Sequence, residues 1–284
     1  MSVMRKVKAF LIGRARSLNR SLFQTLPGGA ADGRLHRSAP VSLEGRELFR
    51  ICDFGITTRM RADSFETKEP ETVRWISSFA KDSRLIDVGA NVGLFSLFAA
   101  SLGHRVLAIE PDALNFALLQ QNIRLNQSAV GDRVSSLPLA LHSEFKISTL
   151  NLSSTEWGGA LSSFDNEVDF KGDRFTPVLR QGVLGMRLDD LTTRLQFEPT
   201  HLKIDVDGNE GEVLDGALKV LLSSALKSIL IELDERRSDY MRSCQAIESA
   251  GFTLVEKTRG SAHLGGDFAM SCNHVFVRQP MKLS

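Results

Sequence analysis

Short apolar runs alternate along this chain with longer stretches in which apolar residues recur at helical spacing. Short runs of this kind are typical of strands buried in a parallel sheet, and the helices between them supply the crossover connections. The pattern predicts strands at 84–88, 105–110, 134–139, 201–206, 228–233, 252–256 and 274–278, helices at 69–79, 92–103, 112–126, 208–223 and 237–250, and a small hairpin within 41–65. We therefore expect an α/β fold with a doubly wound, seven-stranded, mostly parallel sheet.

The N-terminal segment differs from the rest of the chain. The first forty residues hold eight lysines and arginines against one acid, Asp32, and apolar residues recur at helical spacing over residues 3–22. This pattern predicts a basic amphipathic helix and a linker over residues 1–50. Three interpretations of the helix stay open: packing on the main domain, peripheral attachment of residues 3–22 to a membrane surface, or a transit peptide.

Composition narrows the classes of protein to which the chain can belong. Of its 284 residues, 42% are hydrophobic, which suffices for one large core, and we expect a main domain over residues 51–284. The formal net charge of +1 gives no overall field to attract a nucleic-acid backbone, so we expect no nucleic-acid partner. No apolar run is long enough to span a bilayer, and the three cysteines lack paired spacing. We expect a cytoplasmic protein with reduced thiols and at most peripheral membrane contact.

Residues 85–97, LIDVGANVGLFSL, form the most informative segment. An apolar strand leads to Asp87, a tight turn holds Gly89, Asn91 and Gly93, and an apolar helix begins directly afterwards. The glycines let the backbone approach a ligand closely, and the start of the helix offers free N–H groups to the polar atoms of that ligand. A strand, turn and helix in this order predict a cofactor-binding turn.

Two features next to the turn favour S-adenosylmethionine over NAD. A nicotinamide fingerprint has a second glycine for the pyrophosphate, and Asn91 stands in that place. Asp87 would repel a pyrophosphate but suits the ammonium group of a methionine moiety. About twenty residues further on, Glu110 ends the next predicted strand, where it is placed to accept hydrogen bonds from the two ribose hydroxyls.

The chain at this point resembles the FkbM-type class I S-adenosylmethionine-dependent methyltransferases. The resemblance rests on DVGANVG at 87–93, on the IEP segment at 109–126, on LKIDVDGNEGEVLDGA at 202–217, on IEL at 231–233 and on KEPETVRWI at 68–76. It extends over roughly residues 60–280 and implies a Rossmann-like fold. It also implies methyl transfer, commonly to a hydroxyl of a sugar, a polysaccharide or a secondary metabolite.

Seven residues form the predicted cofactor site. The IEP segment adds Asn115, and His142 follows the third strand, where class I enzymes of this type meet the adenine edge. The complete set is Asp87, Gly89, Asn91, Gly93, Glu110, Asn115 and His142.

We expect the chemistry to centre on residues 201–210, HLKIDVDGNE. The period of a strand places Lys203, Asp205 and Asp207 on one side. A lysine inside a parallel strand requires a carboxylate nearby, because burying an unpaired ammonium is very unfavourable. Asp205 is the expected partner, either in a purely structural ion pair or with a catalytic role.

The sequence leaves open which group removes the acceptor proton. Asp205 and His274 are candidate bases, and Lys203 and Glu232 complete the predicted catalytic set, with Glu232 placed to orient the acceptor. A second route uses a divalent cation held by Asp205 with Glu232 or Asp234.

About sixty residues, 141–200, separate the third and fourth predicted strands, and we expect a substrate-side insert there. Within it Trp157 either presents an aromatic face to the substrate or covers the core. We predict an S-adenosylmethionine-dependent O-methyltransferase that acts on a small molecule or a glycan. The alternatives are an NAD-dependent oxidoreductase and a non-catalytic interaction protein.

Overall fold

The computed structural model describes residues 37–259 and 270–279. The predicted basic helix at 3–22 lies outside the described residues, as do the three interpretations attached to it. Within the described part of the chain, no helix is both long enough and apolar enough to cross a membrane.

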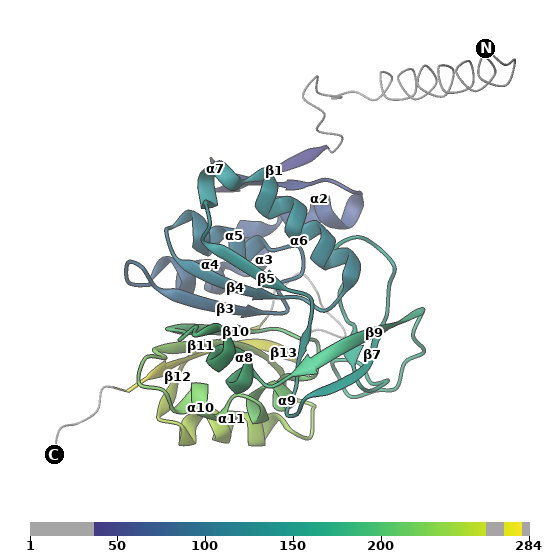
Figure 1. The fold of residues 1–284 in the computed structure, drawn as a ribbon, viewed down its shortest axis with the longest axis vertical. Coiled ribbons are helices and arrows are strands. Elements are labelled where there is room, and N and C mark those ends of the chain that lie inside the picture. Colours follow the sequence, from purple (N-terminus) through teal and green to yellow (C-terminus); the bar gives the residue numbers. More distant parts are fainter. Residues whose placement is uncertain (1–36, 260–269, 280–284) are drawn as a thin grey trace, which may run out of the picture. The chain divides into compact units, whose positions relative to one another are not determined.

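A central seven-stranded sheet confirms the predicted fold class (Figure 1). Its strands lie in the order β12, β13, β11, β10, β3, β4, β5. The five from β11 to β5 run parallel, and β13 is antiparallel to both β11 and β12. Their bounds are β3 Arg84–Val88, β4 Arg105–Ile109, β5 Val134–Leu137, β10 His201–Ile204, β11 Ser228–Asp234, β12 Phe252–Arg259 and β13 Ser271–Arg278. Because β3 and β10 are neighbours, the order reverses between them, which is where such sheets bind ligands.

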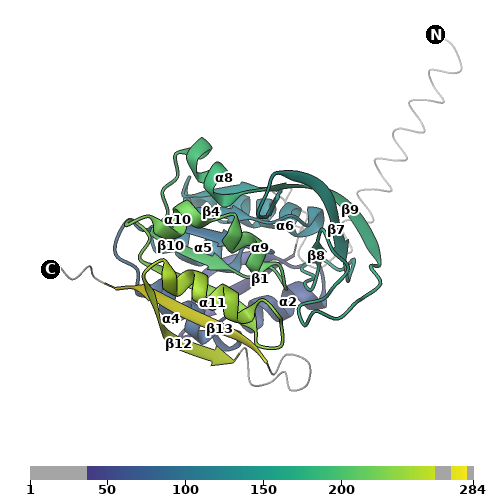
Figure 2. The ribbon, with the colours of Figure 1, turned by 90° about the horizontal axis from the view of Figure 1, so that it is seen from below.

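Helices cover both faces of this sheet and form two separate cores. One face carries α4 Pro70–Ser77, α5 Leu94–Ser101 and α6 Ala113–Leu125, whereas the other carries α8 Leu188–Leu195, α9 Glu210–Asp215, α10 Leu218–Leu222 and α11 Tyr240–Ser249. Figure 2 shows α9, α10 and α11 over the second face. Alternation along the strands supplies both cores, since Leu85 belongs to the first and Ile86 to the second.

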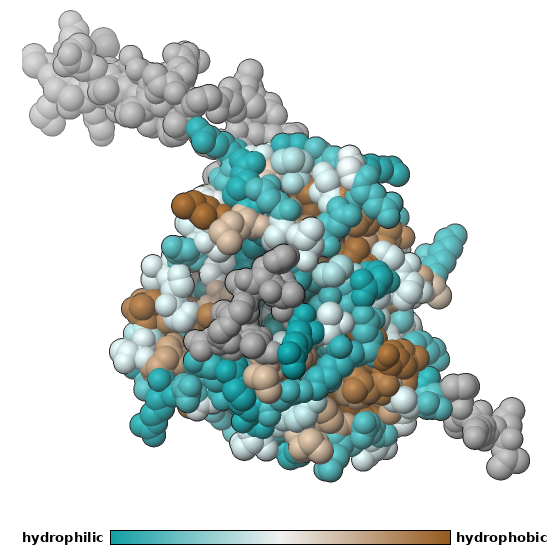
Figure 3. Space-filling model, turned by 180° about the vertical axis from the view of Figure 1, so that it is seen from behind, coloured by the Kyte–Doolittle hydropathy of each residue, from teal (hydrophilic) through white to brown (hydrophobic). Residues whose placement is uncertain are grey.

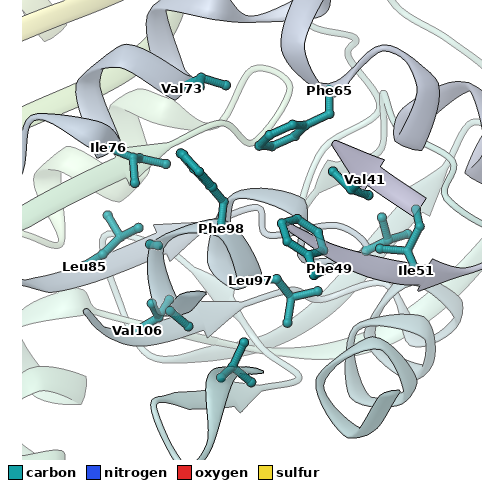
Figure 4. Packing of buried hydrophobic residues seen from close by; sticks show 14 of the residues in the cluster. Val41, Phe49, Ile51, Phe65, Val73, Ile76, Leu85, Leu97, Phe98 and Val106 are labelled. Atoms are coloured by element: carbon teal, nitrogen blue, oxygen red, sulfur yellow. The ribbon is translucent and has the colours of Figure 1, made fainter. Parts of the chain in front are cut away.

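The first core extends beyond the sheet to a small hairpin. The hairpin consists of β1 Ser38–Leu43 and β2 Arg46–Cys52, and Figure 4 shows Val41 and Phe49 from it packed in one cluster with Phe65 and Phe98. The hairpin was predicted, but it ends at Cys52. Residues up to Lys68 instead form α2 Ile56–Asp63 and α3 Phe65–Lys68.

The predicted helix over 208–223 is two helices, α9 and α10. Gly216 lies at the break, where a Cβ atom would come within 2.2 Å of the carbonyl oxygen of His142. The side chain of Asp189 accepts hydrogen bonds from the N–H groups of Lys219 and Val220 at 3.0 Å, so it caps α10. Asp189 itself belongs to α8, so it caps the neighbouring helix and not its own.

The insert between the third and fourth parallel strands contains a second sheet that the sequence did not reveal. It has four strands in the order β6, β9, β7, β8, with bounds β6 Ala140–Leu141, β7 Lys146–Leu152, β8 Ser163–Phe164 and β9 Leu179–Met186. Leu150, Leu152 and Val183 pack in its own small core, whereas Ile147 on the opposite face is 80% exposed. On the side of the molecule in Figure 3, exposed hydrophobic residues form separate patches among hydrophilic ones.

Candidate active site

A cavity of about 290 Å³ lies at the carboxyl ends of the parallel strands, at the point where the strand order reverses. One end is lined by residues of the cofactor-binding turn and by the apolar residues Ile109, Leu139 and Leu141. The other end is rich in charged and polar side chains, namely Arg61, Lys68, Glu69, Asp205, Asp207, Glu232, Ser271 and Asn273. The cavity therefore has two halves. The half next to β4, which we call the apolar half, combines apolar residues with Glu110, Asp112 and Asn115, and the half next to β10 and β11, the polar half, is lined mainly by charged and polar side chains.

The predicted turn has the backbone that its glycines require. Gly89 has a φ of +78°, and a Cβ atom there would lie 1.8 Å from the carbonyl oxygen of Asp205. Gly93 has a φ of +88°, and its Cβ would lie 2.4 Å from the side chain of Leu119. Gly89 and Asn91 line the cavity, whereas Gly93 starts α5 behind it. Gly93 thus shapes the turn and does not contact the cavity.

Glu110 occupies the end of β4 that the sequence predicted. It is buried, lines the cavity and accepts hydrogen bonds from the backbone N–H groups of Asn91 at 2.7 Å and Asp112 at 2.9 Å. Burial raises the pKa of Glu110 to about 8. The two backbone bonds fix the carboxyl group in one orientation at the cavity wall.

Asn115 lines the cavity, but its amide is bonded to residues 157–161 of the insert, which we call the strap. Its Oδ1 accepts a hydrogen bond from the N–H of Gly158 at 3.0 Å, and its Nδ2 donates to the carbonyl of Gly159 at 3.0 Å. Asn91 Nδ2 donates to the same carbonyl at 2.7 Å. At the start of the strap, the ring of Trp157 packs against Phe54, with centroids 4.8 Å apart. Trp157 therefore covers the first core and does not line the cavity.

Asp87 is buried and is not among the residues that line the cavity. Its Oδ2 accepts a hydrogen bond from Ser96 at 2.6 Å, and its register partner in β10 is Lys203. Burial raises the pKa of Asp87. The strand turns the side chain toward α5, and Oδ1 of Asp87 has no hydrogen-bond partner among the described residues. The contact between Asp87 and a methionine ammonium stays a prediction.

The predicted pair of Lys203 and Asp205 is confirmed, with 2.9 Å between Nζ and Oδ2. Lys203 is 1% exposed, lies over the ring of Phe95 and does not line the cavity. Burial lowers the pKa of Lys203, but Asp205 and Asp87 outweigh it and raise that pKa above its usual value. The ammonium of Lys203 therefore acts only through Asp205. The prediction that Lys203 belongs to the groups that contact the reactants was wrong, because Lys203 does not line the cavity.

Asp205 reaches the cavity and shares a side-chain hydrogen bond with Glu232. Burial raises the pKa of Asp205, yet Lys203 and Glu232 together hold it below its usual range. Burial and the Asp205 charge raise the pKa of Glu232 well above its usual value, and Ser271 donates to Glu232 Oε1 at 2.8 Å. Asp205 is therefore the more acidic group of the pair, and Glu232 retains a proton more readily than Asp205 does.

Asp207 stands beside this pair at the cavity wall. Its Oδ2 accepts a hydrogen bond from the N–H of Leu161 at 2.6 Å, at the end of the strap. Burial and the Asp205 charge raise the pKa of Asp207 to about 6. The sequence had given the Asp207 side chain no role.

Two predicted histidines lie outside the cavity. His274 is fully buried on the α11 face, where Nδ1 is 2.9 Å from the carbonyl oxygen of Cys272 and Nε2 is 3.2 Å from the Tyr240 hydroxyl. Burial lowers its pKa. His142 points toward Asp165 and Glu212, at 3.8 and 3.6 Å. Both assignments were wrong, because the alternation of side chains along each strand presents the neighbouring residue to the cavity.

The neighbouring residues are Leu141 beside His142, and Asn273 beside His274. Asn273 is the register partner of Glu232, and its Nδ2 donates to the buried Glu71 at 2.8 Å. This bond uses one of the two N–H groups of the amide, so the second N–H and the carbonyl oxygen of Asn273 remain for a ligand in the cavity. The sequence gave only a weak signal for this residue, its place in the last strand.

The predicted metal ligands are not arranged as a site. Asp234 forms an ion pair with Arg236 through both carboxylate oxygens. Among the described residues, no three side chains of His, Cys, Asp or Glu are grouped so that they could share a metal ion. Asp205 instead forms an ion pair with Lys203, and Glu232 accepts a hydrogen bond from Ser271.

Comparisons with known proteins agree with the fold and the turn. The family model of the methyltransferase FkbM domain matches residues 87–254. Methyltransferase 1 of Beauveria bassiana (strain ARSEF 2860) is 25% identical over 192 residues, which cover 63% of this chain and 76% of that protein. The family match favours methyl transfer over the two alternatives, an NAD-dependent oxidoreductase and a non-catalytic interaction protein.

Two solved structures resemble this chain at low sequence identity. A S-adenosylmethionine-dependent methyltransferase from Agrobacterium tumefaciens has a TM-score of 0.47 at 11% identity and covers 88% of this chain and 72% of its own. An rRNA methylase from Streptococcus thermophilus has a TM-score of 0.46 at 10% identity, covering 75% of this chain and 97% of its own. The family match extends over more than half of the chain and includes the turn, Glu110 and the Lys203–Asp205 segment. The chain therefore belongs to the FkbM domain family of S-adenosylmethionine-dependent methyltransferases.

Proposed function

We propose that this methyltransferase transfers the methyl group to a hydroxyl of a small molecule or a glycan. The observation that carries the proposal is the carboxylate of Asp205 at the cavity wall, held 2.9 Å from the buried ammonium of Lys203 and beside Glu232. A hydroxyl is a poor nucleophile until its proton is removed, and a fixed carboxylate within reach supplies the base.

The residues of the apolar half fit S-adenosylmethionine. Glu110 is placed to accept hydrogen bonds from the ribose hydroxyls, and Ile109, Leu139 and Leu141 offer an apolar wall for the adenine. The carboxyl groups at the other half favour a ligand that carries positive charge. When bound, the cofactor supplies a methyl group that its sulfonium already activates.

The protein's own part in the reaction is alignment and proton removal. Asp205 would accept a hydrogen bond from the acceptor hydroxyl and take its proton during the transfer, which leaves the oxygen free to act as the nucleophile. Lys203 keeps the carboxylate ionised before the transfer, and Glu232 stabilises the same charge by its hydrogen bond. Fixing the acceptor in a near-attack geometry supplies the remainder of the rate enhancement.

The lining of the polar half supports a hydroxylated acceptor over a nucleobase. Proteins that act on single bases usually stack them on aromatic side chains. Among the described residues that line the cavity, Phe164 is the one aromatic, and Glu232, Ser271 and Asn273 are hydrogen-bonding groups. Such groups suit the hydroxyls of a sugar or a polyol.

The test uses the full chain and S-adenosylmethionine labelled in the methyl group. The purified protein is incubated with three acceptor pools: neutral oligosaccharides, small phenols and polyols, and total RNA. We expect label in one of the first two pools, as a base-stable ether identified by mass spectrometry. Label in RNA, or on nitrogen in any product, would overturn the proposal.

Asp205→Asn tests the mechanism on whichever acceptor is labelled. We expect kcat to fall by a factor of about 100 or more, since removing a general base commonly costs that much, with little change in the KM for the cofactor. Asp190→Asn, on the exposed side of α8, is the matched control and should retain activity. Equal kcat values for the two variants would remove Asp205 from the mechanism.

A further inference from the structure

The strap forms a wall of the cavity and is held from its cofactor side by two asparagines. Gly159, Ala160 and Leu161 line the cavity together with Glu110. Asn115 binds both an N–H and a carbonyl group of the strap, and Asn91 binds the same carbonyl. The backbone N–H of Asn91 also donates to Glu110, so that the strap, Asn91 and Glu110 form one connected network.

The amide of Asn115 is buried and bonded to the strap through both its oxygen and its nitrogen. The residue is 4% exposed, its oxygen accepts from the N–H of Gly158 and its nitrogen donates to the carbonyl of Gly159. A paired donor and acceptor on one rigid amide fix both the position and the orientation of the backbone they bind. Gly158 has a φ of +80° and Leu161 a φ of +65°, so the strap has a bent backbone that requires such external bonds.

We propose that Asn115 is a positioning residue, which acts on S-adenosylmethionine through the strap and not by touching the cofactor. With Asn115 in place, the strap completes the cavity wall beside the cofactor-binding turn, to which it is bonded through Asn91. Without it, the N–H of Gly158 and the carbonyl of Gly159 lose partners, and the wall moves away from the cofactor.

The two ends of the strap link this effect to other parts of the molecule. Leu161 donates to Asp207 in the polar half, so the strap joins the cofactor half of the cavity to the acceptor half. Trp157 packs on Phe54 at the other end, where its indole ring reports the position of the strap by its fluorescence. The chain has one other tryptophan, Trp75, whose indole N–H donates to Ser228 in the core.

The experiment measures S-adenosylhomocysteine affinity and Trp157 emission in the same variants, so it needs no acceptor. For Asn115→Ala we expect the Kd from titration calorimetry to rise about tenfold, and the emission of the ligand-free protein to shift to longer wavelength as Trp157 leaves Phe54. The shift should vanish when Trp157→Phe is added. Asn115→Asp, which retains the acceptor for Gly158 but loses the donor to Gly159, provides a second variant that changes a single atom.

The matched control is Asn151→Ala. Asn151 lies in the insert and is as deeply buried as Asn115, with 4% of each residue exposed. Its side chain also donates to a backbone carbonyl, that of Asn166 at 2.7 Å, but Asn151 does not line the cavity. It should keep both the wild-type Kd and the wild-type emission. An unchanged Kd in both Asn115 variants would overturn the proposal, and so would a raised Kd with unchanged Trp157 emission, since that result indicates a direct contact with the cofactor. Melting temperatures of all variants confirm that each is folded when it is titrated.

Discussion

The ammonium of Lys203 lies 2.9 Å from Oδ2 of Asp205, and only Asp205 of the two reaches the cavity. The positive charge is thus buried beneath the site while the negative charge faces the reacting groups. In such a pair the lysine serves stability and keeps its partner ionised, and removing it leaves an uncompensated buried charge.

Lys203→Met tests this relationship. We expect the free energy of unfolding to fall by about 3 kcal/mol, because breaking a buried ion pair by removing one partner commonly costs that much. Arg180→Met, which breaks an exposed pair with Glu167, should cost less than about 1 kcal/mol. Urea unfolding at pH 7 measures both. A loss for Lys203→Met no larger than that for Arg180→Met would show that the buried pair contributes no more than a surface pair.

Cofactor binding should depend on pH through Glu110, whose pKa is raised to about 8 by burial. An ionised carboxylate is the stronger acceptor for the ribose hydroxyls, so binding favours loss of the proton. Between pH 6 and pH 8 the affinity for S-adenosylhomocysteine should rise with pH, by at most about tenfold per unit, and level off above. Calorimetry in two buffers with different ionisation enthalpies should detect release of a proton on binding.

Glu110→Gln is the comparison for that pH profile. It keeps an oxygen that accepts hydrogen bonds but removes the titration, so its Kd should be nearly constant from pH 6 to pH 8. Parallel profiles in the two proteins would assign the pH dependence to some other group.

Short stretches of sequence were enough to predict the elements that depend only on neighbouring residues. The strands β3 and β4 follow from apolar runs, and the turn between β3 and α5 follows from glycines that need positive φ or have no room for a Cβ. Glu110 follows from its place at the end of β4. These elements are determined by residues within about twenty positions of one another, so a single sequence carries enough information to place them.

Features that depend on distant partners were missed or misassigned. Whether His274 or Asn273 meets the cavity depends on the register of β13 against β11, which neighbouring residues do not determine. Asn115 acts on Gly158 and Gly159, more than forty positions away. The insert sheet was missed because it buries one face only in part, so that Ile147 and Leu184 face outward and the alternation of buried and exposed residues loses its contrast.

Buried carboxyl groups should make the fold less stable as pH rises above neutrality. Burial raises the pKa of Glu110 to about 8 and of Glu210 to about 7, from 4.5 in the unfolded chain. Between pH 6.5 and pH 8 the folded state therefore binds more protons than the unfolded state, and the free energy of unfolding falls as pH rises. His201 makes the free energy of unfolding rise with pH, but mainly below pH 6.5, because burial lowers the pKa of His201 from 6.5 to about 3.

The size of this decline from Glu110 alone is roughly 2 kcal/mol between pH 6.5 and pH 8. Urea unfolding at several pH values measures it, and Glu110→Gln should make the decline shallower by that amount. Glu198→Gln, at an exposed residue, should leave the slope unchanged. Stability that rises from pH 6.5 to pH 8 in the wild type would contradict the assignment.

His274 should be dispensable for the chemistry although it is fully buried. Its ring lies near the carbonyl of Cys272 and the hydroxyl of Tyr240, on the face of β13 that α11 covers, so it cannot reach an acceptor in the cavity. His274→Gln should lower the melting temperature, because a buried hydrogen-bonded ring is replaced by a flexible chain. At a temperature where the variant is folded, kcat should stay within about threefold of wild type and the pH profile should keep its shape, whereas loss of a general base costs about 100-fold or more. A loss of that size in the folded variant, together with a missing limb of the pH profile, would restore His274 as the base and displace Asp205.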